Sequence, residues 1–144
     1  MRETVLGVLR HRAALDHVVR QVASRPLDRI DPPVLVALRL GAYELLYLDR
    51  VPDFAAVDQA VELVKPTSPT SPARPTGRSR RSAPLGPATR GTRDRHAGAA
   101  GFVNGVLRRI ANEGRDLLPA PPEPGDVAAL ATYRSHPRWW VARL

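Results

Sequence analysis

Residues 39–65 decide the fold, and they read Arg-Leu-Gly-Ala-Tyr-Glu-Leu-Leu-Tyr-Leu-Asp-Arg-Val-Pro-Asp-Phe-Ala-Ala-Val-Asp-Gln-Ala-Val-Glu-Leu-Val-Lys. Apolar residues recur at three- and four-residue steps on both sides of a Val-Pro-Asp turn, which predicts two amphipathic helices. The first is expected from residue 32 to about 49 and the second from roughly 54 to 65. Their apolar faces should carry Val34, Leu35, Leu38, Ala42, Leu45, Leu46 and Leu48, and Val57, Ala60, Val61 and Val64.

Local signals predict where these helices begin. Asp31 precedes Pro32, which indicates an N-cap followed by proline in the first turn, where a missing N–H costs nothing. Asp53 is the expected cap of the following helix. Gly41 lies inside the first helix at a cost of up to about 1 kcal/mol against alanine, which suggests a close crossing with another helix.

Outward from this block, helical periodicity continues in both directions. Residues 2–23 are expected to form one helix, interrupted only by Arg12, whose apolar positions are Val5, Val8, Leu9, Leu15, Val18, Val19 and Val22. Downstream, periodicity resumes at Ala99 or Ala100 and ends near Gly114, with Phe102, Val103, Val106, Leu107 and Ile110 on one face. A spacer follows, then a short helix capped by Asp126 and a last apolar turn.

Residues 66–98 interrupt this pattern. The stretch from 66 to 100 holds six prolines, repeated Pro-Thr-Ser units and seven arginines, and it has no apolar stripe. Such a composition cannot bury enough surface to offset its ordering entropy, so we expect disorder. The chain is thus divided into a helical part at 1–65, a disordered insertion at 66–98, a further helix at 99–118 and a spacer with terminal turns at 119–144. The fold class is all-α.

Composition limits the possible functions. The 144 residues contain no cysteine, which excludes disulfides, thiolate metal sites and a thiol nucleophile. No apolar run approaches the ~20 residues of a membrane span, and no secretory signal is present, so a cytoplasmic location is expected. The net charge of +8 suggests a nucleic-acid partner, but most of it comes from the insertion.

The stretch at 39–65 and the sequence Gly-Phe-Val-Asn-Gly-Val-Leu-Arg-Arg at 101–109 together resemble the NusB family of all-helical RNA-binding domains. They are most similar to the NusB-like domain that opens bacterial ribosomal-RNA cytosine-5 methyltransferases of the Sun/Fmu (RsmB) type. Arg-Pro-Leu-Asp-Arg-Ile-Asp-Pro-Pro at 25–33 and Tyr-Arg-Ser-His-Pro-Arg-Trp-Trp-Val at 133–141 are typical of that branch. The resemblance covers residues 1–65 and 99–144.

This resemblance implies RNA binding, with ribosomal RNA as the expected partner and possibly a ribosomal protein. It also implies a bundle without its first helices, and a linker at 119–144 that leads to a methyltransferase domain outside this chain. Trp139 and Trp140 would then contact that domain. This chain alone is not expected to be an enzyme, because the S-adenosylmethionine loop and the nucleophilic cysteine of the family belong to the other domain. No cofactor or metal is expected here.

The candidate RNA-binding residues are arginines, and each has an alternative interpretation. Arg10 and Arg12 form a basic cluster with His11. This cluster either contacts RNA or is simply a helix face exposed to solvent. Arg108 and Arg109 contact phosphates or favour the helix dipole. The insertion arginines Arg78, Arg80 and Arg81 attract RNA without sequence preference or solubilise a tether. Tyr43 and Tyr47, four residues apart, are expected to pack rather than to stack on bases.

Two other functions remain open from the sequence. One is a free-standing NusB-type antitermination factor, and the other is a fragment with no function of its own. A catalytic site is not indicated, since the four histidines are scattered and Asp58 and Glu62 are an i, i+4 pair on a helix surface.

Overall fold

The structure is a computed structural model that describes residues 2–65 and 90–143, with only the backbone described for Arg2 and residues 90–97. Within these ranges it consists of helices and has no strand. In chain order they are α1 (Arg2–Arg10), α2 (Arg12–Val22), the 3-10 turn η1 (Leu27–Arg29), α3 (Pro32–Tyr47), α4 (Asp53–Val64), α5 (Arg90–Glu113), the 3-10 turn η3 (Gly114–Leu117), α6 (Val127–Arg134) and α7 (Arg138–Val141).

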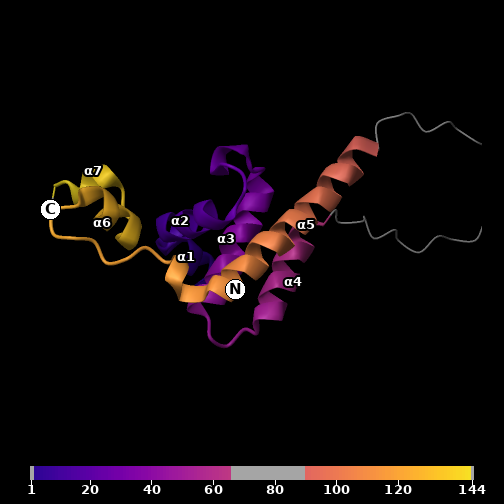
Figure 1. Cartoon of the computed structure of the whole chain (residues 1–144), viewed down its shortest axis with the longest axis horizontal. Coiled ribbons are helices and arrows are strands. Elements are labelled where there is room, and N and C mark those ends of the chain that lie inside the picture. Colours follow the sequence, from indigo (N-terminus) through magenta and orange to yellow (C-terminus); the bar gives the residue numbers. More distant parts are fainter. Residues whose placement is uncertain (1, 66–89, 144) are drawn as a thin grey trace, which may run out of the picture.

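Helix α3 is the centre of the bundle, and α2, α4 and α5 pack around it (Figure 1). Leu15, Leu38, Leu107 and Ile110 from three different helices are fully buried. Val106 belongs to the same core, and Leu45 and Val61 pack against it. The sequence prediction of one shared helical interior is therefore confirmed. None of the helices in the described part of the chain is both long and apolar enough to cross a membrane.

Gly41 allows a close crossing of α3 with α4 and α5. A Cβ atom at this position would lie 2.5 Å from Cδ1 of Leu107 in α5 and 3.1 Å from Cβ of Ala60 in α4. The close approach predicted from a glycine inside a helix is confirmed. It packs α5, which is distant in sequence, against the consecutive helices α3 and α4.

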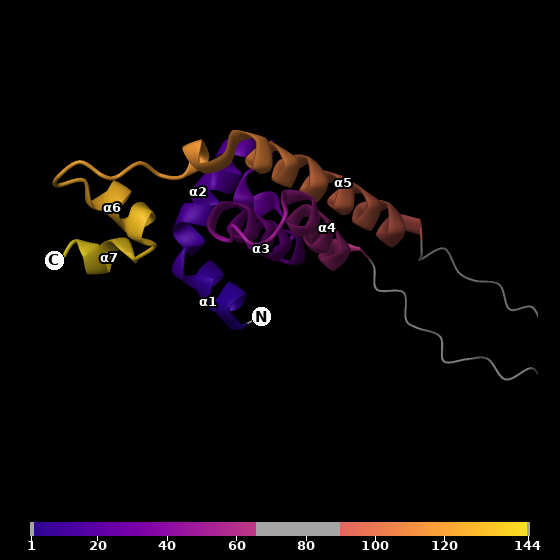
Figure 2. The same cartoon turned by 90° about the horizontal axis from the view of Figure 1, so that it is seen from below.

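The single helix predicted for residues 2–23 is wrong, because the chain breaks at His11. His11 has φ −104° and ψ 14°, outside the helical region, and α1 bends away from α2 there (Figure 2). Helix α1 then packs on α3 through Gly7, where any side chain would overlap the ring of Tyr43. Because α1 leaves the line of α2, Val5 and Leu9 are exposed instead of buried.

Helix α5 begins earlier than the sequence indicated. The prediction placed its start at Ala99 or Ala100, whereas the helix extends back to Arg90 and projects beyond α4 (Figure 1). Apolar periodicity marks only the part of a helix that packs, while helix propagation adds a hydrogen bond per residue without any packing partner. Residues 90–98 of the predicted insertion are therefore helical, and residues 66–89 lie outside the described residues.

Helices α6 and α7 form a small C-terminal lobe, connected to η3 by an extended segment and packed against α2 (Figure 1). The Asp126 side chain accepts a hydrogen bond from the Ala129 N–H at 2.9 Å, which confirms the predicted cap. The predicted Asp53 cap is wrong, because Pro52 occupies the N-cap and Asp53 lies in the first turn. Asp31 is at its predicted N-cap position but its side chain makes no capping bond.

Candidate nucleic-acid interface

A large hollow, which we call the lobe cleft, lies between the bundle and the C-terminal lobe. It has a volume of about 1000 Å³. Its walls come from the α1–α2 junction, the end of α3, the extended segment after η3 and the end of α6. They are formed by Leu6, Leu9, Arg10, His11, Ala14, Tyr47, Leu118, Pro119, Pro121, Tyr133, Arg134, Ser135 and His136.

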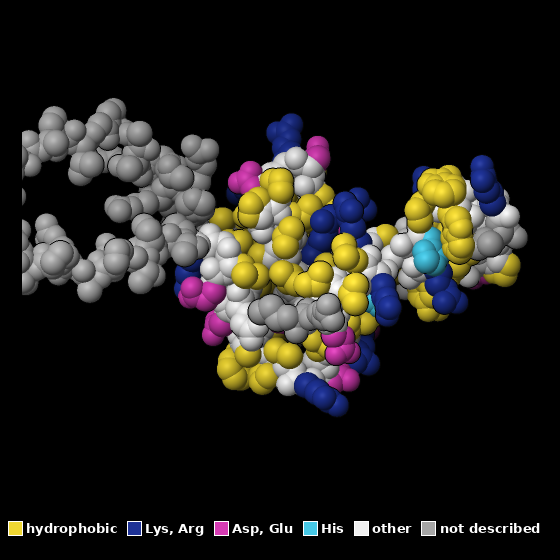
Figure 3. Space-filling view, turned by 180° about the vertical axis from the view of Figure 1, so that it is seen from behind, with side chains coloured by type: hydrophobic (Ala, Val, Ile, Leu, Met, Phe, Trp, Pro, Cys, Tyr) yellow, Lys and Arg dark blue, Asp and Glu magenta, His cyan; other side chains and the backbone are white. Residues whose placement is uncertain are grey.

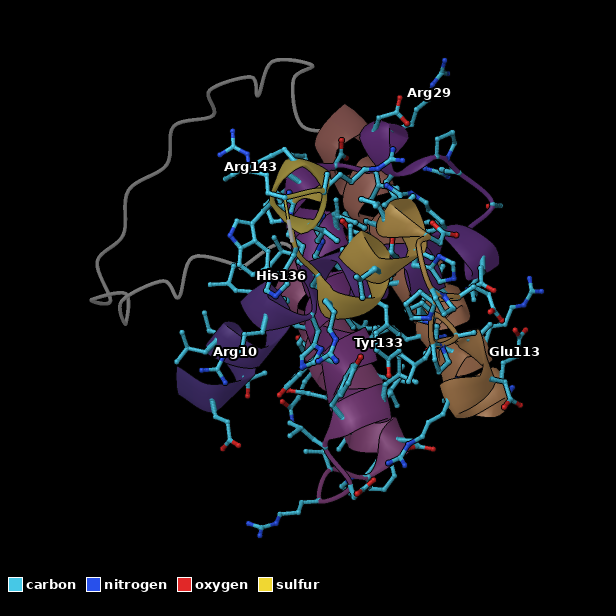
Figure 4. The ribbon with its side chains drawn as sticks, turned by 90° about the vertical axis from the view of Figure 1, so that its left-hand side faces the viewer. Arg10, Arg29, Glu113, Tyr133, His136 and Arg143 are labelled. Carbon is cyan, nitrogen blue, oxygen red and sulfur yellow. The ribbon has the colours of Figure 1, made fainter. Side chains whose placement is uncertain are left out.

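Only positive and neutral side chains line the lobe cleft. Arg10 of α1 and Arg134 of α6 both line it, and neither Asp nor Glu is among the described residues that line it. Figure 4 shows Arg10 on α1 beside the lobe that carries Tyr133 and His136, while Arg29 and Glu113 lie at the periphery. Two cations without a neighbouring carboxylate create a local positive potential that favours an anion.

Flat aromatic rings form one wall of the lobe cleft. The His11 and Tyr47 rings stack with centroids 4.4 Å apart, and Tyr47 stacks on Tyr43 at 5.3 Å. Burial lowers the pKa of His11, and the Arg10 charge lowers it further, so the imidazole is mainly neutral near pH 7. Burial also raises the pKa of Tyr47, with smaller contributions from Tyr43 and Tyr133. The wall is thus uncharged and aromatic, with arginines at its edges.

A hydrogen bond fixes the two walls relative to each other. Helix α6 ends in a left-handed residue, Ser135, with φ 54°. Its hydroxyl oxygen accepts a hydrogen bond from the backbone N–H of Ala14 in α2 at 3.3 Å. Since His11 has no cap bond and α2 starts directly after it, this contact supplies an acceptor for the first turn of α2. The lobe is therefore tied to the bundle beside Arg10 and Arg134.

The predicted site residues fall in separate places. Arg10 lines the lobe cleft, whereas Arg12 is exposed on the first turn of α2 and does not line it. On α5, Arg108 donates to Asn104 Oδ1 at 3.1 Å and Arg109 donates to Glu113 Oε1 at 2.7 Å. Both are exposed side chains with partners on their own helix. Arg78, Arg80 and Arg81 lie outside the described residues.

The sequence did not indicate Arg134, Tyr133 or His136 as cleft residues. They are separated from Arg10 by more than a hundred positions, and only the packing of α6 on α2 brings them together. A signal was present in the Tyr-Arg-Ser-His run at 133–136, which places an aromatic and a cation side by side. Tyr43 packs in the core as predicted. Tyr47 packs against the core and also lines the lobe cleft.

Trp139 and Trp140 remain accessible at the end of the lobe. Their exposed fractions are 65% and 42%, although the following residue, Val141, is buried. Trp140 makes an edge contact with the His136 ring at a centroid distance of 4.7 Å. Both indoles are thus available to a further contact.

Comparison with known sequences gives one family and two kinds of relative. Residues 1–74 match the NusB family. The probable ribosomal RNA small subunit methyltransferase B of Bacillus subtilis is 36% identical over 98% of this chain and 25% of that protein. A putative methyltransferase of Mycobacterium tuberculosis is 34% identical over 95% of this chain and 25% of its own length.

Antitermination proteins match a smaller part of the chain. The transcription antitermination protein NusB of Limosilactobacillus fermentum is 39% identical over 47% of this chain and 50% of that protein. The chain therefore spans about a quarter of the length of the methyltransferases and half of this NusB protein. No solved structure was found to match.

Proposed function

Since this chain belongs to the NusB family, we propose that it binds RNA as the NusB-like domain of a ribosomal-RNA cytosine-5 methyltransferase. The extent of the matches supports the methyltransferase assignment. The two methyltransferases align with nearly the whole chain, including the segment that forms the C-terminal lobe, whereas the antitermination protein aligns with about half. The lobe supplies Tyr133, Arg134 and His136 to the lobe cleft, and the methyltransferase of Bacillus subtilis aligns over 98% of the chain that contains them.

The observation that carries the proposal is the combination of cations and rings in the lobe cleft. Arg10 and Arg134 suit two phosphates of a backbone, and the ring of Tyr47 or His11 suits an unpaired base between them. Base–aromatic stacking contributes about 1–3 kcal/mol per base and needs single-stranded RNA, because in a duplex the neighbouring bases cover both faces of each base. We therefore assign an unpaired ribosomal-RNA segment to this cleft.

Methyl transfer, in this proposal, belongs to another domain. We assign neither catalysis nor S-adenosylmethionine binding to residues 2–143. Trp139 and Trp140, exposed on α7, would contact the catalytic domain, and a ribosomal protein is a further candidate partner. The setting would be the cytoplasm. The role of this chain is to hold RNA beside the site being modified.

The test compares two RNA classes by fluorescence anisotropy. Single-stranded oligonucleotides that tile the small-subunit ribosomal RNA are measured against an antitermination element and a duplex of matched length. We expect at least one ribosomal segment to bind tenfold more tightly than the other two RNAs. Preference for the antitermination element would make the chain a transcription factor, and equal binding of all three would contradict specific recognition.

A second assay tests whether this chain transfers methyl groups by itself. The chain is incubated with small-subunit ribosomal RNA and radiolabelled S-adenosylmethionine, and methyl incorporation is counted. We expect none above the no-protein control. Turnover by the chain alone would contradict our assignment of catalysis to another domain.

A further inference from the structure

A second hollow, the acidic groove, lies on the side of α1 away from the lobe cleft. It has a volume of about 630 Å³ and runs between α1, α3 and α4. Val5, Leu40 and Leu63 form its apolar floor, and Val5 and Leu63 are 52% and 60% exposed. Figure 3 looks onto the face that carries α1, where hydrophobic side chains gather near the centre and both acidic and basic side chains surround them. Large apolar side chains in such a group cost free energy when they stay in water.

The rim of the acidic groove carries only negative charge. Glu44 of α3 and Asp58 and Glu62 of α4 line it, and none of the described lining residues is Lys, Arg or His. Glu62 is paired with Lys65 outside the groove at 2.5 Å, and burial raises the pKa of Glu44. Asp58 is exposed and makes no ion pair among those found in the described residues. In a chain of net charge +8, this patch has the opposite sign.

We propose that the acidic groove binds a basic amphipathic helix of a partner polypeptide. An apolar floor between two helices suits the apolar stripe of a third helix, as in other helix-in-groove complexes. Lys or Arg residues on the flanks of that helix would face Glu44, Asp58 and Glu62. These same carboxylates repel RNA phosphates, so the groove is separate from the RNA-binding function proposed for the lobe cleft.

A second copy of this chain does not fit the groove. A two-fold dimer places the same patch of both subunits together, so two acidic rims would face each other. Like charges at such a distance disfavour association. A two-fold dimer through the acidic groove is therefore disfavoured, and we assign the groove to a different polypeptide.

The test uses a synthetic 18-residue peptide with a leucine stripe flanked by lysines. Two controls are a scrambled peptide of the same composition, which has no apolar stripe, and a peptide with glutamates in place of the lysines. Isothermal titration calorimetry with the whole chain should show one site for the leucine–lysine peptide, with at least tenfold weaker binding of both controls. Equal binding of the scrambled peptide would contradict the proposal.

Two sets of variants locate the binding. Asp58→Lys/Glu62→Lys reverses two rim charges, and Leu63→Ser removes an exposed part of the floor; each should weaken the peptide at least tenfold. Asp116→Lys/Glu123→Lys makes the same charge change at exposed residues outside the groove and should leave the affinity within twofold. Circular dichroism verifies that all variants fold. Unchanged binding to the groove variants, or a sedimentation-detected dimer that Leu63→Ser dissolves, would overturn the proposal.

Discussion

At the scale of single residues, the ion pair between α2 and α3 is the one most protected from solvent among the ion pairs of the described residues. Arg39 donates from Nε to Asp16 Oδ1 at 2.7 Å and from its terminal nitrogen to Oδ2 at 2.9 Å. The exposed fractions of the two side chains are 15% and 14%. A bidentate arginine–carboxylate pair is directional, so it fixes the register of the two helices as well as adding free energy.

We expect Arg39→Met to destabilise the fold by about 1–3 kcal/mol, because it leaves a half-buried carboxylate without its partner. Urea denaturation monitored by circular dichroism measures the change. The matched control is Arg115→Met, which breaks the exposed pair with Asp49 and should cost under about 1 kcal/mol. Asp16→Asn added to Arg39→Met should recover part of the loss; an Arg39→Met effect no larger than the control would show that the pair contributes little.

The roles of several single residues were predicted from the sequence. Gly41, Asp126 and Tyr43 have the roles that their local sequence indicated, because each carries its signal in the residue type and its position in a helix or turn. Arg134 could not be assigned in this way. The role of Arg134 in the cleft depends on Arg10, which is far away in sequence. No local sequence pattern predicts that these two residues line the same cleft.

At the scale of elements, the close packing of α3, α4 and α5 depends on Gly41, which has no side chain. We expect Gly41→Val to lower the free energy of unfolding by about 1–3 kcal/mol through overpacking against Leu107 and Ala60. Gly105→Ala is the control, since a Cβ there meets nothing within 4 Å and the position is exposed on α5. Alanine should stabilise that helix by about 0.5–1 kcal/mol. Thermal melts measure both variants. Melting temperatures that are both above or both below that of the parent would contradict this packing.

Apolar periodicity in the sequence predicted which segments form helices. It did not predict where the helices end or break. The break at His11 lies beside Arg12, the one interruption of the apolar period, but a single polar residue in such a pattern does not by itself predict that a helix ends. The cause is tertiary, because Gly7 can approach Tyr43 only if α1 turns toward α3. The early start of α5 was missed because its first turns have no apolar periodicity, which was the signal used to predict the helix.

At the scale of the whole molecule, α1 separates two surfaces of opposite charge. Leu6, Leu9 and Arg10 face the basic lobe cleft, while Thr4 and Val5 border the acidic groove. The two ligands that we propose, RNA and a basic helix, would therefore bind at different surfaces of opposite charge. The net charge alone indicated a nucleic-acid partner, but the division into two surfaces became apparent only in the folded chain.

The most direct test of the account is the affinity of single-stranded ribosomal RNA for two double variants that remove equal charge. Arg10→Ala/Arg134→Ala removes both guanidinium groups of the lobe cleft, and Arg108→Ala/Arg109→Ala removes two exposed arginines on α5. Anisotropy titrations across a salt series should show the cleft variant at least tenfold weaker, with a salt slope lower by roughly 0.7 per lost phosphate contact, and the α5 variant within twofold of the parent. Equal losses in both variants, or full affinity in the cleft variant, would contradict RNA binding in the lobe cleft.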